Sequence, residues 1–459
     1  MAIVGGGISG LATAYYLSKR GAPFTLIEKR AHLGGVIRTL NLQGCLVEAG
    51  PDSYISVKPW ARDLINELGL GGEVIGSKDD ERVTFIWKAG RLIPMPDGLQ
   101  FMIPTEIGPM ISTPLLGFGS KLQMAIEYFR KPPTEPLPDR SVAEFVRSHF
   151  GQEVVDYLAE PLLSGIYGGD PEHLSVNAVL PRMVELETKY GSLSKGTLDA
   201  RQNAVRQPPD RTPLFSTLRN GLGSLVDSLL DSVAETIEGV RGEVEAIERA
   251  GDRYRLRVND DWIEADHVVL ACEAHAAARM LNAGSQPFDP ELAGLLDSIP
   301  YSSSMTLALA FDGKDLASIP QGFGFLVPKR ERQQLVACTF VGNKFPFRES
   351  GDLILVRCFL GGAGGEEVVA LDDESALQVV LDELREKMDI TAKPVFSAVS
   401  RWPRSMAQYT VGHQDRVRRI EEKLKQHSGL HLVGNAYYGI GIPDCVRMAK
   451  EVAGRVLRS

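Results

Sequence analysis

A glycine-rich segment near the start of the chain carries the clearest chemical pattern in the sequence. Residues 5–10 read Gly-Gly-Gly-Ile-Ser-Gly, which matches G-x-G-x-x-G, and Glu28 follows 18 residues after Gly10. Glycines at this spacing bring the backbone close to a pyrophosphate, and an acid at this distance accepts hydrogen bonds from a ribose diol. The pattern predicts dinucleotide binding, and a glycine turn without a ligand is the alternative.

The other reactive residue types form no comparable pattern. The eight histidines are scattered, and the five cysteines lie far apart without a C-x-x-C pair. Metal sites and disulfide frameworks need closer groupings, so we predict neither. A lone histidine is more often structural, and we assign no catalytic side chain, His413 included. The net charge of −9 argues against a nucleic-acid partner, because phosphate contacts need clustered lysines and arginines.

The residues around the glycine segment predict the elements that a dinucleotide site requires. Residues 2–4 indicate a short buried strand, residues 11–20 a helix, and residues 23–27 a second strand that ends at Glu28. This order places free backbone N–H groups at the start of a helix, where they can bind phosphate. We therefore expect a Rossmann-like domain to begin the chain.

Two later segments are expected to complete this domain. Their predicted elements are a helix ending at Val233, an antiparallel pair at 243–247 and 254–258, buried strands at 267–272 and 430–436, and a helix over 445–457. A glycine-rich turn precedes the last helix, so backbone N–H groups again meet at a helix start.

The segment after Glu28 resembles the flavin amine-oxidase superfamily, in which G-G-x-x-R-T/S follows the ribose-binding acid. Residues 34–39 match this motif, and residues 48–53 are similar to the superfamily's second flavin-contacting loop. The resemblance implies FAD, rather than NAD, as the cofactor. It implies FAD contacts at Gly5, Gly6, Gly7, Ile8, Ser9, Gly10, Glu28, Lys29, Gly35, Arg38, Gly50, Pro51, Asp52, Ser53, Val244, Trp402, Gly434, Ile440, Gly441 and Ile442. For Arg38 a surface cation is the alternative, and for Val244 an ordinary strand valine.

Further stretches narrow the resemblance to one family. These are the opening segment, PLLSGIYGGDPEHLS from Pro161, GFGFLVP at 322–328, YTVGH at 409–413 and GNAYYGIGIPDCV at 434–446. Together they resemble the oxygen-dependent protoporphyrinogen oxidase family over nearly the whole chain. The resemblance implies FAD-dependent oxidation of a porphyrinogen to a porphyrin in haem biosynthesis. Protoporphyrinogen IX and coproporphyrinogen III both stay open as substrates.

Porphyrinogen chemistry is consistent with the lack of an assigned base. The lone pair of a pyrrole nitrogen can push a hydride from a saturated bridge carbon, and we expect flavin N5 to accept that hydride. Three such transfers remove six electrons, with oxygen as the family's usual acceptor. The protein must hold the bridge carbon, exclude water and stabilise the reduced cofactor.

Substrate contacts are predicted at Arg82, Phe323, Phe325 and Leu326. Arginine suits a propionate, and a macrocycle face suits aromatic and aliphatic side chains. The family's carboxylate-binding arginine would fall on Thr84 of this chain, and Arg82 is the nearest arginine. For Phe323, Phe325 and Leu326, core packing is the alternative.

The expected fold class is α/β, with a Rossmann-like FAD-binding domain, an inserted α+β substrate domain and a helical subdomain, as in flavin amine oxidases. We assign residues 1–60, 205–284 and 411–459 to the FAD-binding domain, residues 61–92, 191–204 and 285–410 to the substrate domain, and residues 93–190 to the helical subdomain.

Residues 99–119 are apolar and contain several prolines, and their uncharged run is too short and broken for a transmembrane helix. They predict either a core segment or an apolar lip that touches a membrane or an oily substrate. We expect a cytoplasmic protein. The sequence does not decide whether the protein contacts the inner face of the cell membrane, a second copy of the chain or a ferrochelatase.

Two other functions are compatible with the sequence. One is a different flavin oxidase acting on an amine or a carotenoid, for which Lys344 could supply the lysine that amine oxidases place near the flavin. The other is a porphyrin carrier that binds flavin for stability and catalyses nothing. Reduction of the flavin by a porphyrinogen without oxygen would separate these from a porphyrinogen oxidase.

Overall fold

The computed structural model describes residues 1–204, 212–284, 288–316 and 319–458. The chain forms two compact units. The first contains Met1–Ser77, Thr212–Tyr301 and Asp415–Ser459, and the second contains Lys78–Arg211 and Ser302–Gln414. Residues 61–77, which we assigned to the substrate domain, therefore lie with the nucleotide elements. The separation of a helical subdomain within the second unit stays a prediction.

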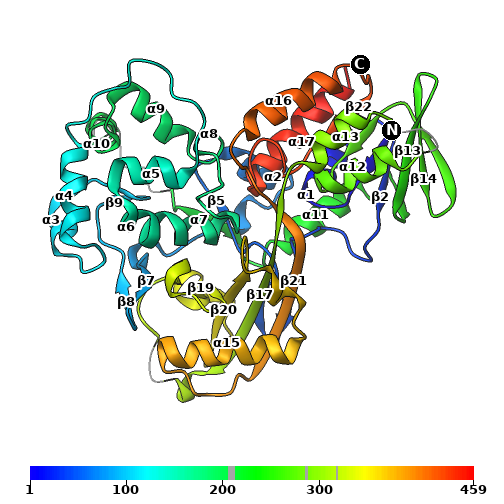
Figure 1. Cartoon of the computed structure of the whole chain (residues 1–459). Helices are drawn as coiled ribbons and strands as arrows, with labels where there is room; N and C mark the ends of the chain where they lie inside the picture. The colour runs from blue at the N-terminus through cyan, green and yellow to red at the C-terminus, as the bar shows by residue number, and fades with distance from the viewer. Residues whose placement is uncertain (205–211, 285–287, 317–318, 459) are drawn as a thin grey trace. The chain divides into compact units, whose positions relative to one another are not determined.

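The first unit is built on a parallel sheet with strand order β12-β2-β1-β16-β22. Its strands are β1 (Ala2–Val4), β2 (Phe24–Glu28), β12 (Ile237–Arg241), β16 (Val268–Leu270) and β22 (Leu430–Leu432). Three helices pack together beside it (Figure 1): α1 (Ile8–Ser18), α11 (Gly223–Val233) and α17 (Ile442–Val456). Strands β1 and β16 are fully buried, as expected of parallel strands covered on both faces.

Smaller elements complete the first unit. They are the hairpin β3 (Thr39–Leu42) and β4 (Cys45–Glu48), the sheet β5 (Tyr54–Ile55), β11 (Phe215–Leu218) and β6 (Val74–Gly76), the antiparallel sheet β13 (Val244–Ala250), β14 (Arg253–Val258) and β15 (Asp261–Ala265), and the helices α2 (Pro59–Glu67), α12 (Ala274–Asn282), α13 (Pro290–Asp297) and α16 (His413–Leu424). The predicted antiparallel pair at 243–247 and 254–258 is thus confirmed.

The helix boundaries differ from the predicted ones where glycine and proline lie near a helix start. Helix α1 begins at Ile8 with Gly7 as its N-cap, three residues before the predicted start. Helix α17 begins at Ile442 instead of Cys445. Proline is tolerated in the first turn because its missing N–H would have no helical partner there, so Pro443 does not delay the helix.

The second unit contains a seven-stranded sheet with strand order β21-β17-β20-β19-β18-β7-β8. Its strands are β7 (Thr84–Lys88), β8 (Arg91–Pro94), β17 (Tyr301–Asp312), β18 (Gly324–Leu326), β19 (Leu335–Phe340), β20 (Leu353–Gly361) and β21 (Phe396–Ala407). Helix α15 (Asp373–Met388) covers this sheet, and its Ala376, Val380 and Leu384 join the hydrophobic core (Figure 1). The short helix α14 (Val341–Lys344) follows β19.

The remaining helices of the second unit gather beside this sheet (Figure 1). They are α3 (Ile107–Ser112), α4 (Phe118–Glu127), α5 (Val142–Phe150), α6 (Gln152–Val154), α7 (Glu160–Tyr167), α8 (Val176–Val179), α9 (Pro181–Tyr190) and α10 (Leu193–Ala204), with the hairpin β9 (Leu99–Gln100) and β10 (Ile103–Pro104). Ser141 caps the start of α5, because its hydroxyl accepts a hydrogen bond from the Glu144 amide.

Residues 99–119 divide between the core and the surface. The side chains that are buried are Met102, Ile103, Met110, Leu115 and Leu116. Ile111 and Phe118 are instead strongly exposed. Neither interpretation of this segment therefore holds for all of it.

A buried ionic cluster joins the helices of the second unit. The His149 ring lies between two carboxylates, 3.0 Å from Glu127 through Nδ1 and 3.0 Å from Glu187 through Nε2, and all three side chains are almost fully buried. Arg140 also donates to both oxygens of Glu187. The Leu193 amide donates to Glu127 at the start of α10. Four helices therefore meet at one set of charges.

The cluster favours charged carboxylates despite their burial. Burial alone would raise the pKa of Glu127 and of Glu187, but hydrogen bonds from His149 lower the pKa of both. Further donors act in the same direction, Ser194 and the Leu193 amide on Glu127 and Arg140 on Glu187. Each ring nitrogen of His149 faces one carboxylate, so the imidazole links the two buried side chains.

We predict that His149→Gln lowers the free energy of unfolding of the second unit by about 3–5 kcal/mol, because it removes the imidazole that is hydrogen-bonded to two buried carboxylates. Urea unfolding followed by circular dichroism measures this. The matched control is His173→Gln, since His173 is strongly exposed and lies 3.9 Å from Asp170. The control should leave the transition unchanged, and equal transitions in the two variants would contradict the prediction.

Candidate cofactor site

The glycine segment forms a tight turn that the protein's own backbone requires. Gly5 has a φ of +108°, and a Cβ added there would lie 2.6 Å from the Ala271 carbonyl oxygen. A Cβ on Gly10 would lie 1.9 Å from the Gly5 carbonyl oxygen. The first turn of α1 therefore packs directly on the end of β1, and no larger residue fits at either position.

Gly7 is different, because no part of the protein fills the space beside it. A Cβ on Gly7 would meet only the Gly35 Cα, at 3.9 Å, and its φ of −75° suits any residue. The Gly34 amide donates to the Gly6 carbonyl at 2.8 Å, which brings the two glycine segments together. The side-chain-free backbone at Gly7 and Gly35 forms an open cradle at the start of α1, where N–H groups face outward.

Glu28, the residue predicted to bind the ribose, lies at the edge of this cradle. The Glu28 carboxylate ends β2, accepts hydrogen bonds from the amides of Gly6 at 2.7 Å and Arg30 at 2.8 Å, and is half-buried. The Glu28 carbonyl accepts from the Gly242 amide, which places the start of β13 at Val244 close by. Lys29 lies 3.8 Å from Glu243 on the same side. The structure thus brings together three predicted residues from distant parts of the chain.

The C-terminal glycine turn reaches the same edge of the sheet. Gly434 follows β22 with a φ of +145°, and a Cβ there would lie 3.8 Å from the Cys272 carbonyl oxygen. Helix α17 starts with Gly441 as its N-cap. Helices α1 and α17 pack against each other, and the Ser9 hydroxyl partly offsets the raised pKa of the Cys445 thiol, so the first turns of the two helices are neighbours. Two helix starts therefore border the cradle, where parallel α/β sheets bind ligands.

The two cysteines near this edge are poor nucleophiles. Burial raises the pKa of the Cys272 thiol to about 12 and that of the Cys445 thiol to about 11. Because the thiolate is the reactive form, both stay as thiols near neutral pH. The site can therefore bind and orient a group, and these cysteines add no covalent chemistry.

The second predicted loop lies beside the glycine segments. The Arg38 carbonyl accepts from the Ala49 amide at 2.9 Å, and a Cβ on Gly50 would lie 1.9 Å from the Val36 carbonyl oxygen. Pro51 is half-buried in this loop, and Ser53 donates to Asp52. The side chain of Arg38 is exposed. The backbones of residues 34–38 and 49–53 are thus held together, as a shared cofactor contact requires.

The remaining predicted residues lie in the second unit. Trp402 is half-buried in β21, and Arg82 is exposed just before β7. Phe325 is 1% exposed and belongs to the hydrophobic core, which favours packing as its role. Phe323 is also buried, whereas Leu326 is half-buried beside Gly165. Substrate contact at these positions stays a prediction.

Sequence reasoning missed Lys58 and Asp444. Lys58 precedes α2 and donates to both oxygens of Asp444, at 2.8 and 2.7 Å, in the first turn of α17. The signal for Asp444 was available, because an acid directly after a glycine turn at a helix start is a common capping arrangement. Nothing near Lys58 in the sequence indicates its partner.

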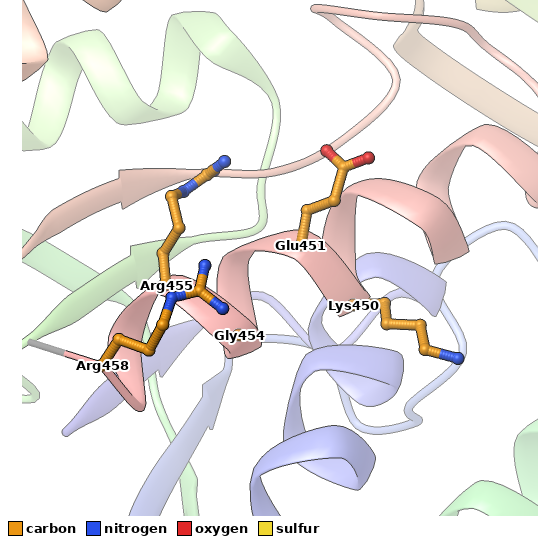
Figure 2. A pocket seen from close by; sticks show the side chains of 5 residues that line it. All are labelled: Lys450, Glu451, Gly454, Arg455 and Arg458. Atoms are coloured by element: carbon orange, nitrogen blue, oxygen red, sulfur yellow. The ribbon is translucent and has the colours of Figure 1, made fainter.

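A separate hollow of about 440 Å³ lies along the last turns of α17. Its lining residues are Lys450, Glu451, Gly454, Arg455 and Arg458. Their charged side chains point in different directions instead of converging on one point (Figure 2). In the described part of the chain, no three histidine, cysteine or acidic residues are grouped to hold a metal. The glycine cradle is therefore the feature with cofactor-binding geometry.

Comparisons with known proteins agree with a flavin site. Residues 8–457 match the family described as flavin-containing amine oxidoreductase. The chain is 32% identical to the coproporphyrinogen III oxidase of Bacillus subtilis, over 99% of this chain and 97% of that protein. It is 26% identical to the chloroplastic protoporphyrinogen oxidase of Nicotiana tabacum, over 99% and 84%.

A solved structure is similar over its full length. A candidate protoporphyrinogen oxidase from Exiguobacterium sp. 255-15 aligns with a TM-score of 0.88 and 34% identity, covering 100% of this chain and 98% of that chain. The predicted fold class is confirmed by this match and by the parallel sheet with its inserted second unit. The chain belongs to the flavin-containing amine oxidoreductase family, and its cofactor is a flavin.

Proposed function

We propose that this chain is an FAD-dependent oxidase that converts a porphyrinogen to a porphyrin in haem biosynthesis, with coproporphyrinogen III as the preferred substrate. The observation that carries the proposal is the end-to-end similarity to coproporphyrinogen III oxidases, combined with an open glycine cradle at the predicted place. Relatives of that name are 30–32% identical over nearly the whole chain, whereas the plant protoporphyrinogen oxidases are 24–26% identical.

The residues of the cradle fit FAD in its two halves. The backbone of Gly5–Gly10 and the start of α1 suit the pyrophosphate, and Glu28 suits the adenosine ribose. The start of β13 at Val244 suits the adenine, which needs backbone partners rather than charge. The turn from Gly434 to Gly441 and the start of α17 suit the flavin ring, where N–H groups can face a developing negative charge.

The protein's own part in the reaction is binding, orientation and exclusion of water. A bound flavin supplies a two-electron acceptor, and we propose oxygen as the final acceptor. Glu28 and the glycine turn would hold the cofactor at one end, so that its reacting end would be presented in one orientation. The cysteines at the sheet edge stay protonated, so they do not compete as nucleophiles. The substrate's pyrrole nitrogen supplies the electronic drive, so no strong protein base is required.

The helical part of the second unit also carries an apolar surface, which we assign to peripheral membrane contact. Four residues on one side of α4 and just after it are exposed by 51–83%: Phe118, Leu122, Ile126 and Phe129. They recur every three or four residues, so they form a continuous stripe. Two residues after Phe129 lies the exposed Lys131, whose ammonium suits anionic headgroups. Within the described residues no helix has the length and apolar character needed to cross a membrane.

The other contacts predicted from the sequence stay predictions. These are a second copy of the chain and a ferrochelatase, and no feature on the surface of the described residues points to either of them.

The amine-oxidase alternative is weakened by the full-length similarity to porphyrinogen oxidases. Lys344 lies in α14 of the second unit, with its ammonium 5.2 Å from the Phe345 ring.

We predict that Gly7→Ala keeps the fold but weakens FAD binding about tenfold to 100-fold, because the new methyl group would meet the pyrophosphate, whereas its one protein neighbour, the Gly35 Cα, lies at an ordinary contact distance of 3.9 Å. Equilibrium titration of the apoprotein with FAD, followed by flavin fluorescence, measures the Kd. Gly239→Ala is the control, since a Cβ on Gly239 in β12 meets nothing within 4 Å and the site lies away from the cradle's glycines. Unchanged FAD affinity in Gly7→Ala would place the cofactor elsewhere.

The substrate preference is tested by following porphyrin fluorescence in air with each porphyrinogen. We predict that kcat/KM for coproporphyrinogen III exceeds that for protoporphyrinogen IX by about tenfold or more, because two further propionates can each form a charge-assisted hydrogen bond. The reverse order would move the assignment to protoporphyrinogen IX. Turnover of neither substrate by an FAD-loaded protein would contradict porphyrinogen oxidation.

Membrane contact is tested with the double variant Phe118→Ser/Phe129→Ser. Each exposed phenylalanine that enters a lipid interface contributes up to about 1.5–3 kcal/mol, so binding should fall at least tenfold. Co-sedimentation with vesicles of phosphatidylglycerol and phosphatidylcholine measures this binding. Val57→Ser is the control, because Val57 is 76% exposed in the first unit. Equal sedimentation of the wild type with and without vesicles would overturn the assignment.

A further inference from the structure

An ion pair joins two elements that border the proposed flavin site. The Lys58 ammonium lies 2.8 and 2.7 Å from the two oxygens of Asp444. The Asp444 side chain is 8% exposed, whereas the Lys58 side chain is 41% exposed. A partly solvated cation therefore covers a carboxylate that is largely removed from water. Such a carboxylate is strongly disfavoured when its partner is lost, because its charge is then uncompensated.

The Asp444 carboxylate lies directly against the glycine turn. A Cβ added to Gly439 would lie 2.3 Å from the Asp444 Cγ and 2.6 Å from Oδ2. A Cβ on Gly441 would lie 3.4 Å from the same Oδ2. Gly439 has a φ of +122°, which a residue with a side chain rarely adopts. The turn from Gly439 to Gly441 is thus folded onto this carboxylate.

A second contact holds the other side of the same turn. Arg447, one turn further along α17, donates to the Tyr438 carbonyl oxygen at 3.0 Å. Its guanidinium lies 5.2 Å from the centre of the Trp60 ring on α2. Lys58 and Trp60 are two residues apart in the chain, so the start of α2 supports both contacts. The turn is therefore held between Asp444 and Arg447, and both of these side chains contact residues at the start of α2.

This arrangement lies close to the start of α1. Helix α17, which carries Asp444 in its first turn, packs against α1, and the Ser9 hydroxyl acts on the pKa of the neighbouring Cys445 thiol. A flavin whose pyrophosphate rests on Gly7 would extend along an edge that the Gly439–Gly441 turn also borders. The charge at Asp444 would then act on the cofactor at short range, with little water in between to screen it.

We propose that Lys58 is a positioning residue for the flavin: it neutralises Asp444 and thereby fixes the Gly439–Gly441 turn against the ring. This inference rests on the proposed function, because it requires FAD in the glycine cradle. Without Lys58, the Asp444 carboxylate either recruits water and displaces the turn or leaves a negative charge beside the cofactor. The first outcome weakens FAD binding. The second makes the flavin harder to reduce, because reduction adds negative charge.

The test compares Lys58→Met with Lys58→Arg, Lys19→Met and the double variant Lys58→Met/Asp444→Asn. Lys19→Met is the matched control, because Lys19 forms a 2.8 Å pair with Glu67 in the same unit and a similar fraction of its side chain is exposed. The measurements are the Kd for FAD, the fine structure of the bound flavin's absorption spectrum, and its midpoint potential. Circular dichroism establishes that each variant is folded.

We expect Lys58→Met to raise the Kd for FAD about tenfold, or to shift the midpoint potential to a more negative value, with an altered flavin spectrum. Lys58→Arg should restore the wild-type values because it retains the cation. The double variant should recover most of the loss because it removes the uncompensated charge. Lys19→Met should match the wild type.

Two results would overturn the inference, and they differ from a failure of the proposed function. A Lys58→Met protein with the Kd, spectrum and potential of Lys19→Met would show that Lys58 is a surface residue only. A double variant that binds FAD no better than Lys58→Met would show that the charge of Asp444 is not the cause. If the wild-type protein binds no FAD at all, the proposed function itself fails, and the inference with it.

Discussion

Backbone contact at the carboxyl ends of β1 and β16 is the constraint on which the first unit depends. The Gly10 backbone lies against the Gly5 carbonyl, and Gly5 lies against the Ala271 carbonyl, at distances that leave no room for a Cβ. The first turn of α1 is fixed by these contacts before any ligand binds. Hydrogen bonds then place Glu28 and Gly34 on Gly6. The cradle is therefore a product of the protein's own packing, which is the preorganisation that tight cofactor binding requires.

The G-x-G-x-x-G motif requires glycine at its three positions for two different physical reasons. At Gly5 and Gly10 a side chain would collide with the protein, whereas at Gly7 it would enter open space. The sequence pattern alone cannot separate these cases, because G-x-G-x-x-G treats each glycine alike. The structure separates them by what surrounds each Cα. Fold stability and ligand binding can consequently be tested independently within six residues of chain.

Features set by nearby residues could be predicted from the sequence, and features that join distant residues could not. The strands at β1, β2 and β16 and the pair β13–β14 follow from local runs of apolar residues, and their positions were predicted to within a few residues. The partners Lys58 and Asp444 are 386 positions apart. In the ionic cluster, His149 is 22 positions from Glu127 and 38 positions from Glu187, which is also beyond the spacing of a single helix or turn. No spacing rule connects such residues, since only the folded topology brings them together.

The basic residues of a sequence are also a poor guide to where propionates bind, because some of them are paired with carboxylates of the protein itself. In the second unit, Arg140 is held by Glu187 at 2.7 Å and Arg332 by Glu160 at 2.9 Å, and each of these arginine side chains is only 14% exposed. Lys387 is fully buried beside Glu383. A count of cations in the sequence includes all three, although each already neutralises a carboxylate of the protein. Candidate substrate contacts must therefore be chosen among cations without such internal partners, and the sequence does not show which these are.

The ionic cluster and the apolar stripe lie on opposite sides of α4, and the cluster explains why the stripe stays exposed. Phe118 and Leu122 face outward, while Glu127 at the end of the helix faces inward to His149 and the Leu193 amide. A rotation of α4 that buried the phenylalanines would increase apolar burial, which is the usual outcome for such residues. The same rotation would pull the Glu127 carboxylate away from its donors and leave His149 and Glu187 buried without it. Because breaking a buried ionic group costs several kcal/mol, the cluster holds the helix in the orientation that keeps its apolar side exposed. An apolar surface maintained against collapse in this way is what the proposed membrane contact requires.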